Sequence, residues 1–340
     1  MDLLLHTNGI KNMLYELKEF FKRCMLFFLF FIPFFSYAFI YHDFDDAMQI
    51  SRYPNTDYAK RTFKEVGVSA DDILDFFRNL YNNNSFRELL QCAYTESLHV
   101  SGRDFDKQDQ GSMRQRIPKI IHQIWIGTEV PQEFRAFQQS WKLIHPDWCY
   151  RLWTQDDIRG FGFKNIEYIT KSRNPAEISD MMRYEILYRY GGVYVDMDQE
   201  CLRAFDELHR LFDFYIGIQP LDSGMVQLGI GVIGSVPGHP LVRELINAIK
   251  YNWQQFEGKQ AVTQRTGPVL CTKVFLKYAK SVFYKNIALP ALYFYPLGSQ
   301  EYDIDKTKWV ASGSLAVHYW AKTWLLPSFR RAAFKGIKNY

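Results

Sequence analysis

Residues 174–198 constrain the fold more than any other part of the chain, because they combine one complete helix with the strand that follows it. A proline stands at the first helical position, where its missing N–H would have no partner in any case. Nothing breaks a helix over residues 175–190, and the Gly-Gly pair that comes next is a strong stop signal. Residues 193–195 are apolar and partly β-branched, so they predict a short buried strand. This strand ends at two carboxylates, Asp196 and Asp198.

Asp196 and Asp198 repel each other, so their site must supply positive charge or protonate one of them. The usual source is a divalent cation with oxygen ligands, Mg²⁺ or Mn²⁺, which leaves coordination positions open for substrate phosphate oxygens. Such a cation stabilises the negative charge that builds on a departing diphosphate.

Asp180 and Arg183 stand three residues apart on the predicted helix and therefore share one of its faces. If that face looks toward the two carboxylates, Arg183 can pair with a phosphate or a sugar hydroxyl, and Asp180 can orient a hydroxyl. The same spacing also suits a plain salt bridge near the start of a helix. The residues alone leave both interpretations open.

Residues 179–198 read SDMMRYEILYRYGGVYVDMD, and this stretch resembles the DXD-motif sugar transferases. These include fungal α-1,6-mannosyltransferases, inositol-phosphoceramide mannosyltransferases and, more distantly, the large glucosylating toxins. The resemblance covers roughly residues 117–324. It implies a metal-dependent hexosyltransferase, mannosyltransferase-like, that uses a UDP- or GDP-sugar and retains the anomeric configuration. The implied acceptor is a glycan, a lipid or a protein.

The resemblance also implies roles for the residues that match the motif. Asp198 binds the metal directly, and Asp196 holds the ribose and the metal shell. Asp180 and Arg183 hold the sugar. His318, in a segment that resembles the family's closing His-x-Trp-x-x-Ser-Trp motif, completes the metal or the diphosphate site. A histidine without this resemblance is more often structural.

Three other aromatic residues and one lysine complete the implied donor site. Trp125 ends the first predicted strand just before Gly127, and it matches the tryptophan that stacks on the base in the toxins; a core tryptophan is the alternative. In the closing segment Trp320 or Trp324 can cover the donor, and Lys322 can neutralise phosphate.

Strands are also predicted over residues 120–126 and 149–153, with an amphipathic helix over residues 131–144 between them. This order implies a parallel sheet with right-handed crossovers, in which ligands bind at the carboxyl ends of the strands. The predicted fold is therefore α/β: a GT-A-like, Rossmann-type mixed sheet flanked by helices, with an N-terminal membrane helix and a small helical segment.

Residues 229–234 spell a literal G-x-G-x-x-G, but a Pro-Gly-His-Pro turn follows them instead of a helix start. As a dinucleotide-binding fingerprint the pattern is therefore weak. The family resemblance instead implies that residues 229–234 form a strand that enters this turn, with a helix over residues 241–256 after it. Relatives often carry an asparagine just before that strand, at a place that contacts the sugar. Gly229, Ile230 and Gly231 stand there in this chain, which leaves the choice of donor sugar open.

Residues 24–41 carry no charge, and a helix over them would span about 27 Å, close to the ~30 Å of a bilayer core. Basic residues precede this run and acidic residues follow it, which predicts a single-pass signal anchor with the large domain on the far side of the membrane. A small-x-small pattern at residues 36–38 favours a cleaved signal peptide and secretion as the alternative. The predicted organisation is a short cytoplasmic N-terminus (1–23), the signal anchor or signal peptide (24–41), a helical stem (42–98), a linker (99–116), a catalytic domain (117–326) and a basic tail (327–340).

Composition excludes several other classes of protein. The formal net charge of +4 does not indicate a nucleic-acid binder. The five cysteines show no CxxC spacing, so metal-finger and redox motifs are not indicated, while a disulfide stays open. The expected partners are thus the nucleotide-sugar donor, the acceptor and, through residues 24–41, a membrane.

Two alternatives remain. Phosphatases with an aspartyl nucleophile also carry a strand-end Asp-x-Asp, but on their first strand and followed by Thr or Val at the fifth place, where this chain has Glu200. A membrane-anchored binding protein without turnover could keep the same fold. The intact pair of carboxylates argues against it.

Overall fold

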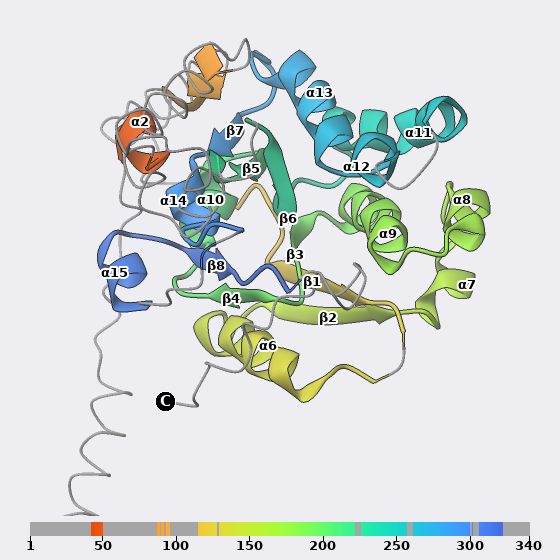
Figure 1. Cartoon of the computed structure of the whole chain (residues 1–340), viewed down its shortest axis with the longest axis horizontal. Coiled ribbons are helices and arrows are strands. Elements are labelled where there is room, and N and C mark those ends of the chain that lie inside the picture. The colour runs from red at the N-terminus through yellow and green to blue at the C-terminus, as the bar shows by residue number, and fades with distance from the viewer. Residues whose placement is uncertain are drawn as a thin grey trace, which may run out of the picture. The chain divides into compact units, whose positions relative to one another are not determined.

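The computed structural model describes most of the predicted catalytic domain and small parts of the predicted stem (Figure 1). These residues all belong to one compact unit, Tyr41–Tyr340. The described residues are 42–49, 87–88, 90–91, 93–95, 115–127, 129–221, 226–256, 261–299, 301 and 306–321. Residues 24–41, the tail 327–340, Lys322 and Trp324 lie outside this part, so the predictions made for them are not described. Within it, none of the helices has the length and apolar character needed to cross a membrane.

The centre of the fold is a six-stranded mixed sheet in the order β2-β1-β3-β6-β5-β7. Its strands are β1 (Ile120–Trp125), β2 (Cys149–Thr154), β3 (Gly192–Val195), β5 (Phe214–Ile218), β6 (Leu228–Ser235) and β7 (Asn286–Leu289). β1 runs parallel to β2 and β3, and β5 runs parallel to β7, whereas β6 is antiparallel to both of its neighbours. The predicted α/β class with a mostly parallel sheet is confirmed.

Helices lie on both sides of this sheet (Figure 1). The described helices are α2 (Phe44–Ala47), α6 (Gln132–Ile144), α7 (Asp157–Phe161), α8 (Ile166–Lys171), α9 (Pro175–Tyr190), α10 (Asp206–Leu211), α11 (Pro240–Gln255), α12 (Ala261–Arg265), α13 (Pro268–Tyr278), α14 (Ala291–Phe294) and α15 (Lys306–Ala311). A second, two-stranded sheet pairs β4 (Gln199–Cys201) with β8 (Ala316–His318). The sequence did not predict β4, β7 or β8 as strands.

The unit of α9 and β3 follows the local signals in the sequence. The Asn174 side chain caps α9 by accepting a hydrogen bond from the Ala176 N–H at 2.9 Å. Gly191 and Gly192 end it with φ values of 64° and 92°. A Cβ on Gly192 would lie 2.5 Å from the Ile120 carbonyl oxygen, so the close approach of β1 as well as the backbone angle requires glycine there.

The described pieces of the predicted stem pack on the catalytic domain. The Tyr94 and Tyr293 hydroxyls lie 2.9 Å apart, and the His42 N–H donates to the Tyr293 hydroxyl at 3.1 Å. An ion pair of 2.9 Å joins Arg87 to Asp45 within the stem. Among the described cysteines, Cys149, Cys201 and Cys271 are all free.

Several histidines are buried in the core in their neutral form. His122 accepts a hydrogen bond from Trp153 Nε1–H at its Nδ1, so its Nε2–H donates to the Gly191 carbonyl at 2.9 Å. Burial lowers the pKa of His122, His145 and His239 to about 4. It lowers the pKa of His209 as well. His122, His145 and His239 each accept a hydrogen bond at one ring nitrogen, which requires that nitrogen to be unprotonated.

We therefore expect acid to destabilise the domain well above the range in which carboxylates titrate. Below about pH 6.5 the unfolded chain binds protons that the buried histidines do not, so each one removes about 1.4 kcal/mol of stability per pH unit down to its folded pKa. Urea unfolding at about pH 7 and about pH 5.5 measures the loss of unfolding free energy. His239→Gln removes one titrating group, so it should make this loss smaller by the share of one histidine, about 1.4 kcal/mol per pH unit. Equal unfolding free energies at the two pH values would contradict this expectation.

Candidate active site

The structure brings Asp196, Asp198 and His318 together at the end of β3. The Asp196 N–H donates to the Gly231 carbonyl on β6 at 2.8 Å, which fixes the first turn after the strand. β4 follows directly and pairs with β8, so that Gln199 lies opposite His318. His318 Nε2 lies 3.1 Å from Asp198 Oδ1 and 3.5 Å from Asp196 Oδ2.

The segment after β8 wraps around Asp198. The Tyr319 N–H donates to the Asp198 carbonyl at 2.9 Å, and the Ala321 N–H donates to its Oδ2 at 2.7 Å. Trp320 takes a left-handed φ of 53°, donates from Nε1 to the Leu297 carbonyl at 2.8 Å, and places its ring 4.3 Å from that of His318. The predicted closing segment thus lies against the acidic turn as far as Ala321.

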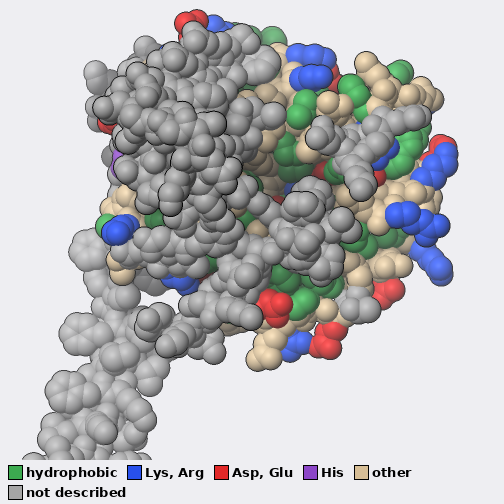
Figure 2. All heavy atoms as spheres, in the orientation of Figure 1, with side chains coloured by type: hydrophobic (Ala, Val, Ile, Leu, Met, Phe, Trp, Pro, Cys, Tyr) green, Lys and Arg blue, Asp and Glu red, His purple; other side chains and the backbone are tan. Residues whose placement is uncertain are grey.

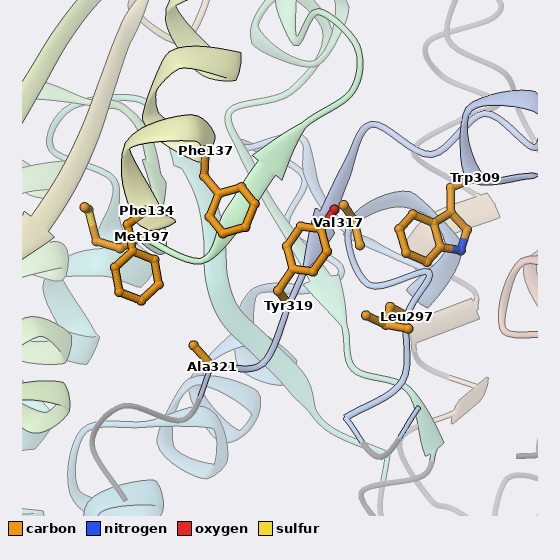
Figure 3. Close-up of a cluster of buried hydrophobic side chains, with 8 residues drawn as sticks. All are labelled: Phe134, Phe137, Met197, Leu297, Trp309, Val317, Tyr319 and Ala321. Carbon is orange, nitrogen blue, oxygen red and sulfur yellow. The ribbon is translucent and has the colours of Figure 1, made fainter. Parts of the chain in front are cut away.

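A cluster of buried apolar side chains supports this arrangement (Figure 3). Its members are Phe134, Phe137, Met197, Leu297, Trp309, Val317, Tyr319 and Ala321. Alternate residues of an extended chain point to opposite sides. Burial of Val317 and Tyr319 in the cluster therefore turns His318 to the other side, toward the acidic turn. Met197 is buried in the same cluster, whereas its neighbours Asp196 and Asp198 both lie against His318. The Phe137 and Tyr319 rings stack at 4.8 Å.

Arg183 connects helix α9 to the acidic turn. Its guanidinium is 4% exposed, lies over the Tyr194 ring, and donates to the Ile230 carbonyl at 2.7 Å. It lies 2.9 Å from Asp180 Oδ1 and 3.4 Å from Asp196 Oδ1. The salt bridge between Asp180 and Arg183 is therefore present, and Arg183 also contacts Asp196. Contact of either residue with a sugar or a phosphate stays a prediction.

The charges at the site shift one another's pKa values. Burial alone would raise the pKa of Asp196, but Arg183 and His318 hold it at about 2. Burial alone would lower the pKa of His318, but the carboxylates of Asp198 and Asp196 raise it to about 9. For Asp180 burial prevails over Arg183 and raises the pKa to about 6. Without a metal, the imidazolium of His318 is therefore the cation between the two carboxylates.

The same three side chains fit a divalent cation. One ligand atom from each of Asp196, Asp198 and His318 can be chosen so that all lie within 4.8 Å of one another. Carboxylate oxygens are the ligands that Mg²⁺ and Mn²⁺ prefer, and imidazole is accepted by transition metals. Nε2 of His318 is the ring nitrogen that lies against both carboxylates, while its buried Nδ1 has no hydrogen-bond partner among the described residues. This is a candidate metal site.

Trp125 and Gly127 lie at the carboxyl end of β1, as the sequence predicted. Trp125 is half-buried: its ring lies 5.5 Å from that of Phe134, and it packs against the apolar cluster. Gly127 has a φ of 142°, and a Cβ there would approach Trp125 Nε1 to 3.9 Å. Trp125 therefore packs against the core, as the alternative interpretation expected, and also lies at the end of the strand. Its stacking on a base stays a prediction.

Tyr295 is a residue of the site that the sequence did not single out. Its hydroxyl accepts a hydrogen bond from the Gly231 N–H at 3.1 Å; its ring meets that of His318 edge to face and is tilted against that of Trp320. A Cβ on Gly229 would lie 2.5 Å from Tyr295, and one on Gly231 would lie 2.8 Å from Asp196 Oδ2. The first two glycines of the G-x-G-x-x-G pattern thus make room for Tyr295 and Asp196, which explains them without a bound dinucleotide.

The comparisons with known proteins agree with this geometry. Residues 131–213 match the model of a family described as "Glycosyltransferase sugar-binding region containing DXD motif". An uncharacterized glycosyltransferase of Acanthamoeba polyphaga mimivirus is 32% identical over 51% of this chain and 70% of its own length. These matches, together with the acidic turn, place the chain in the class of sugar-transferring enzymes. The chain belongs to the family of DXD-containing glycosyltransferases.

Fungal relatives are similar over longer stretches. Inositol phosphoceramide mannosyltransferase 2 of Schizosaccharomyces pombe is 31% identical over 68% of this chain and 65% of its own length. A mannosyl phosphorylinositol ceramide synthase of Saccharomyces cerevisiae is 33% identical over 53% of this chain and 48% of its own length. The chain thus spans about half to two thirds of these two relatives. Among solved structures, the PaToxG glycosyltransferase matches with a TM-score of 0.38 and 19% identity, over 55% of this chain and 78% of that one.

Thr266 binds the second carboxylate oxygen of Asp180, the one that Arg183 does not contact. It belongs to residues 265–268, which resemble the family's Thr-Gly-Pro signature; that resemblance left a sugar or acceptor pocket and a plain helix start both open. Its hydroxyl donates to Asp180 Oδ2 at 2.9 Å, and its carbonyl accepts from the Tyr184 hydroxyl at 2.7 Å. The neighbouring Arg265 forms a 2.8 Å ion pair with the buried Glu177. The Arg-Thr-Gly loop is thereby fixed to helix α9.

We expect Thr266→Val to destabilise the protein by about 1–3 kcal/mol, because it leaves a buried carboxylate oxygen without its donor while the volume stays nearly constant. Thr266→Ser keeps the hydroxyl and should cost less. Urea unfolding of the wild type and the two variants measures both effects. Equal stability of the Val and Ser variants would show that the hydrogen bond does not support Asp180.

Proposed function

We propose that this protein is a metal-dependent glycosyltransferase of GT-A-like fold that moves a hexose from a UDP- or GDP-sugar to an acceptor with retention of configuration. The observation that carries the proposal is the meeting of Asp196, Asp198 and His318 at one strand end beside Arg183. The names of the fungal relatives support mannose as the sugar and a lipid as the acceptor, although a glycan or a protein acceptor is also compatible with the site.

The side chains of this chain would divide the work as follows. Asp198, with Asp196 and His318, would hold Mn²⁺ or Mg²⁺, which when bound supplies positive charge for a leaving nucleoside diphosphate. Asp196 would also hold the ribose. Its carboxylate is well fixed for this, because Tyr194 donates to its Oδ1 at 2.6 Å. No protein nucleophile is assigned.

The other donor contacts follow from position. Arg183 and Asp180 would contact the sugar, as α9 presents them beside the acidic turn. Trp125 and Gly127 at the end of β1 would receive the base, and Trp320 would cover the donor. Lys322 and Trp324 keep their proposed donor-binding roles, and residues 24–41 their proposed membrane contact, although both lie outside the described residues.

A phosphatase with an aspartyl nucleophile is not favoured by this site. Its attacking carboxylate needs a free oxygen and a motif on the first strand. Here β1 and β2 precede β3, and Asp196 is engaged by Tyr194 and Arg183 at Oδ1 and lies near His318 at Oδ2. Between the two enzyme classes, the site therefore favours the glycosyltransferase.

We expect Asp198→Asn to abolish metal-dependent turnover and to leave the protein folded. Asparagine keeps the shape but loses the charge that a hard cation requires. The measurement is hydrolysis of a panel of UDP- and GDP-sugars by the full chain, with Mn²⁺, Mg²⁺ or EDTA. The expected loss is at least about 100-fold, of the order seen when a main electrostatic contribution to catalysis is removed.

Asp156→Asn is the matched control, because Asp156 is exposed and its side chain makes no capping hydrogen bond. It should hydrolyse the donor like the wild type. Hydrolysis by Asp198→Asn at the wild-type rate would refute the assignment of this residue. Hydrolysis that is equally fast in EDTA would refute metal dependence.

A further inference from the structure

A second concave site lies away from the acidic turn, where α7, the loop after it, the C-terminal part of α9 and the first half of α11 meet. It is a cavity of about 520 Å³. Its lining includes Lys164, Glu185, Tyr188, Arg189, Arg243 and the buried Phe161. Volumes of this size are typical of small-molecule sites. Asp180 and Arg183 lie more than one turn earlier on α9 than Arg189, and neither lines the cavity.

Within the described residues, none of the cations that line this cavity forms an ion pair with a carboxylate, although Arg189 acts on Glu185 at longer range. Lys164 Nζ donates to the side-chain oxygen of Asn247 at 2.5 Å. Arg189 donates to the Phe161 carbonyl at 2.5 Å and stacks on its ring at 3.9 Å. The exposed side chain of Arg243 makes no hydrogen bond or ion pair with any described residue. Figure 2 shows Lys and Arg side chains along the edge of the molecule at which Figure 1 places α7 and α8.

The carboxylate that lines the cavity is already used by the protein. Glu185 is 6% exposed. Its Oε2 accepts from the Lys164 backbone N–H at 2.5 Å, and its Oε1 accepts from the backbone and side-chain N–H groups of Asn165 at 2.8 and 3.1 Å. Glu185 thus anchors the loop after α7 and offsets only part of the positive charge. Three cations face one cavity with one carboxylate among them.

We propose that this cavity binds a phosphate-bearing polyanion, at a site separate from the donor site. A guanidinium group can donate two parallel hydrogen bonds to two oxygens of one phosphate. A ligand with two or more phosphate charges can therefore bind Arg189, Arg243 and Lys164 together. Phe161 and Tyr188 offer apolar and aromatic surface to the part of the ligand that carries the phosphates. The ligand is either a soluble phosphate compound or a lipid headgroup. The proposal does not depend on the proposed function.

The test uses the full chain in EDTA, with inorganic pyrophosphate as the soluble probe in calorimetric titration. Vesicles of phosphatidylcholine with and without phosphatidic acid are the lipid probe in a flotation assay. Arg243→Glu reverses the charge of an exposed side chain that supports no described contact. Lys250→Glu makes the same change two turns later on α11, outside the cavity, and is the matched control.

We expect Arg243→Glu to weaken binding at least about 10-fold, because it removes one charge-assisted contact and adds a negative charge that repels the ligand. Lys250→Glu should change binding less than about 2-fold. If the effect appears with pyrophosphate, the ligand is soluble; if it appears only as phosphatidic-acid-dependent flotation, the ligand is a lipid headgroup. Binding in neither assay, or equal binding by Arg243→Glu and the wild type, overturns the proposal. Asp198→Asn should bind like the wild type, which separates this result from any failure of the donor site.

Discussion

Negative charge gathered at the end of β3 has to be balanced, and the arrangement of the site follows from that requirement. Asp180, Asp196 and Asp198 are largely removed from water, where an unpaired carboxylate is strongly unfavourable. Arg183 supplies one positive charge from α9, and His318 supplies another from β8. A cation at the acidic turn would take over part of this balance. Arg183 is thus one fixed positive partner, and in the proposed function a divalent cation would take over the charge that His318 supplies.

Packing brings these charges together from distant parts of the chain. The pairing of β4 with β8 places His318 beside Asp198. The apolar cluster of Figure 3 buries Met197, Val317 and Tyr319, the neighbours of these site residues, on the side away from the site. On the other side, the glycines of β6 let Tyr295 and Asp196 approach the backbone closely. The site therefore depends on both sheets. A change in the cluster, such as at Tyr319, would move His318 even though the two side chains face opposite ways.

The sequence predicted those parts of the structure that are specified locally. The proline, the Gly-Gly pair and the short apolar run were enough to predict α9, β3 and the acidic turn, because each signal acts within a few residues. Asp180 and Arg183 could be placed on one helix face, but their direction could not be known. His318 was reached through the family resemblance, since three-residue strands such as β4 and β8 have too little pattern to predict their pairing. Tyr295 was missed, and the contact of Thr266 with Asp180 was not foreseen, because both arise between residues far apart in the sequence.

The most direct test of this account is a crystal structure with Mn²⁺ and a nucleotide sugar, in which anomalous scattering locates the metal. The account predicts one Mn²⁺ at about 2.1 Å from a carboxylate oxygen of Asp198, the distance that hard divalent cations take. It also predicts that the donor diphosphate lies on the open side of this ion and the sugar beside Arg183. A donor bound elsewhere, or a diphosphate held at the acidic turn without any metal, would contradict it.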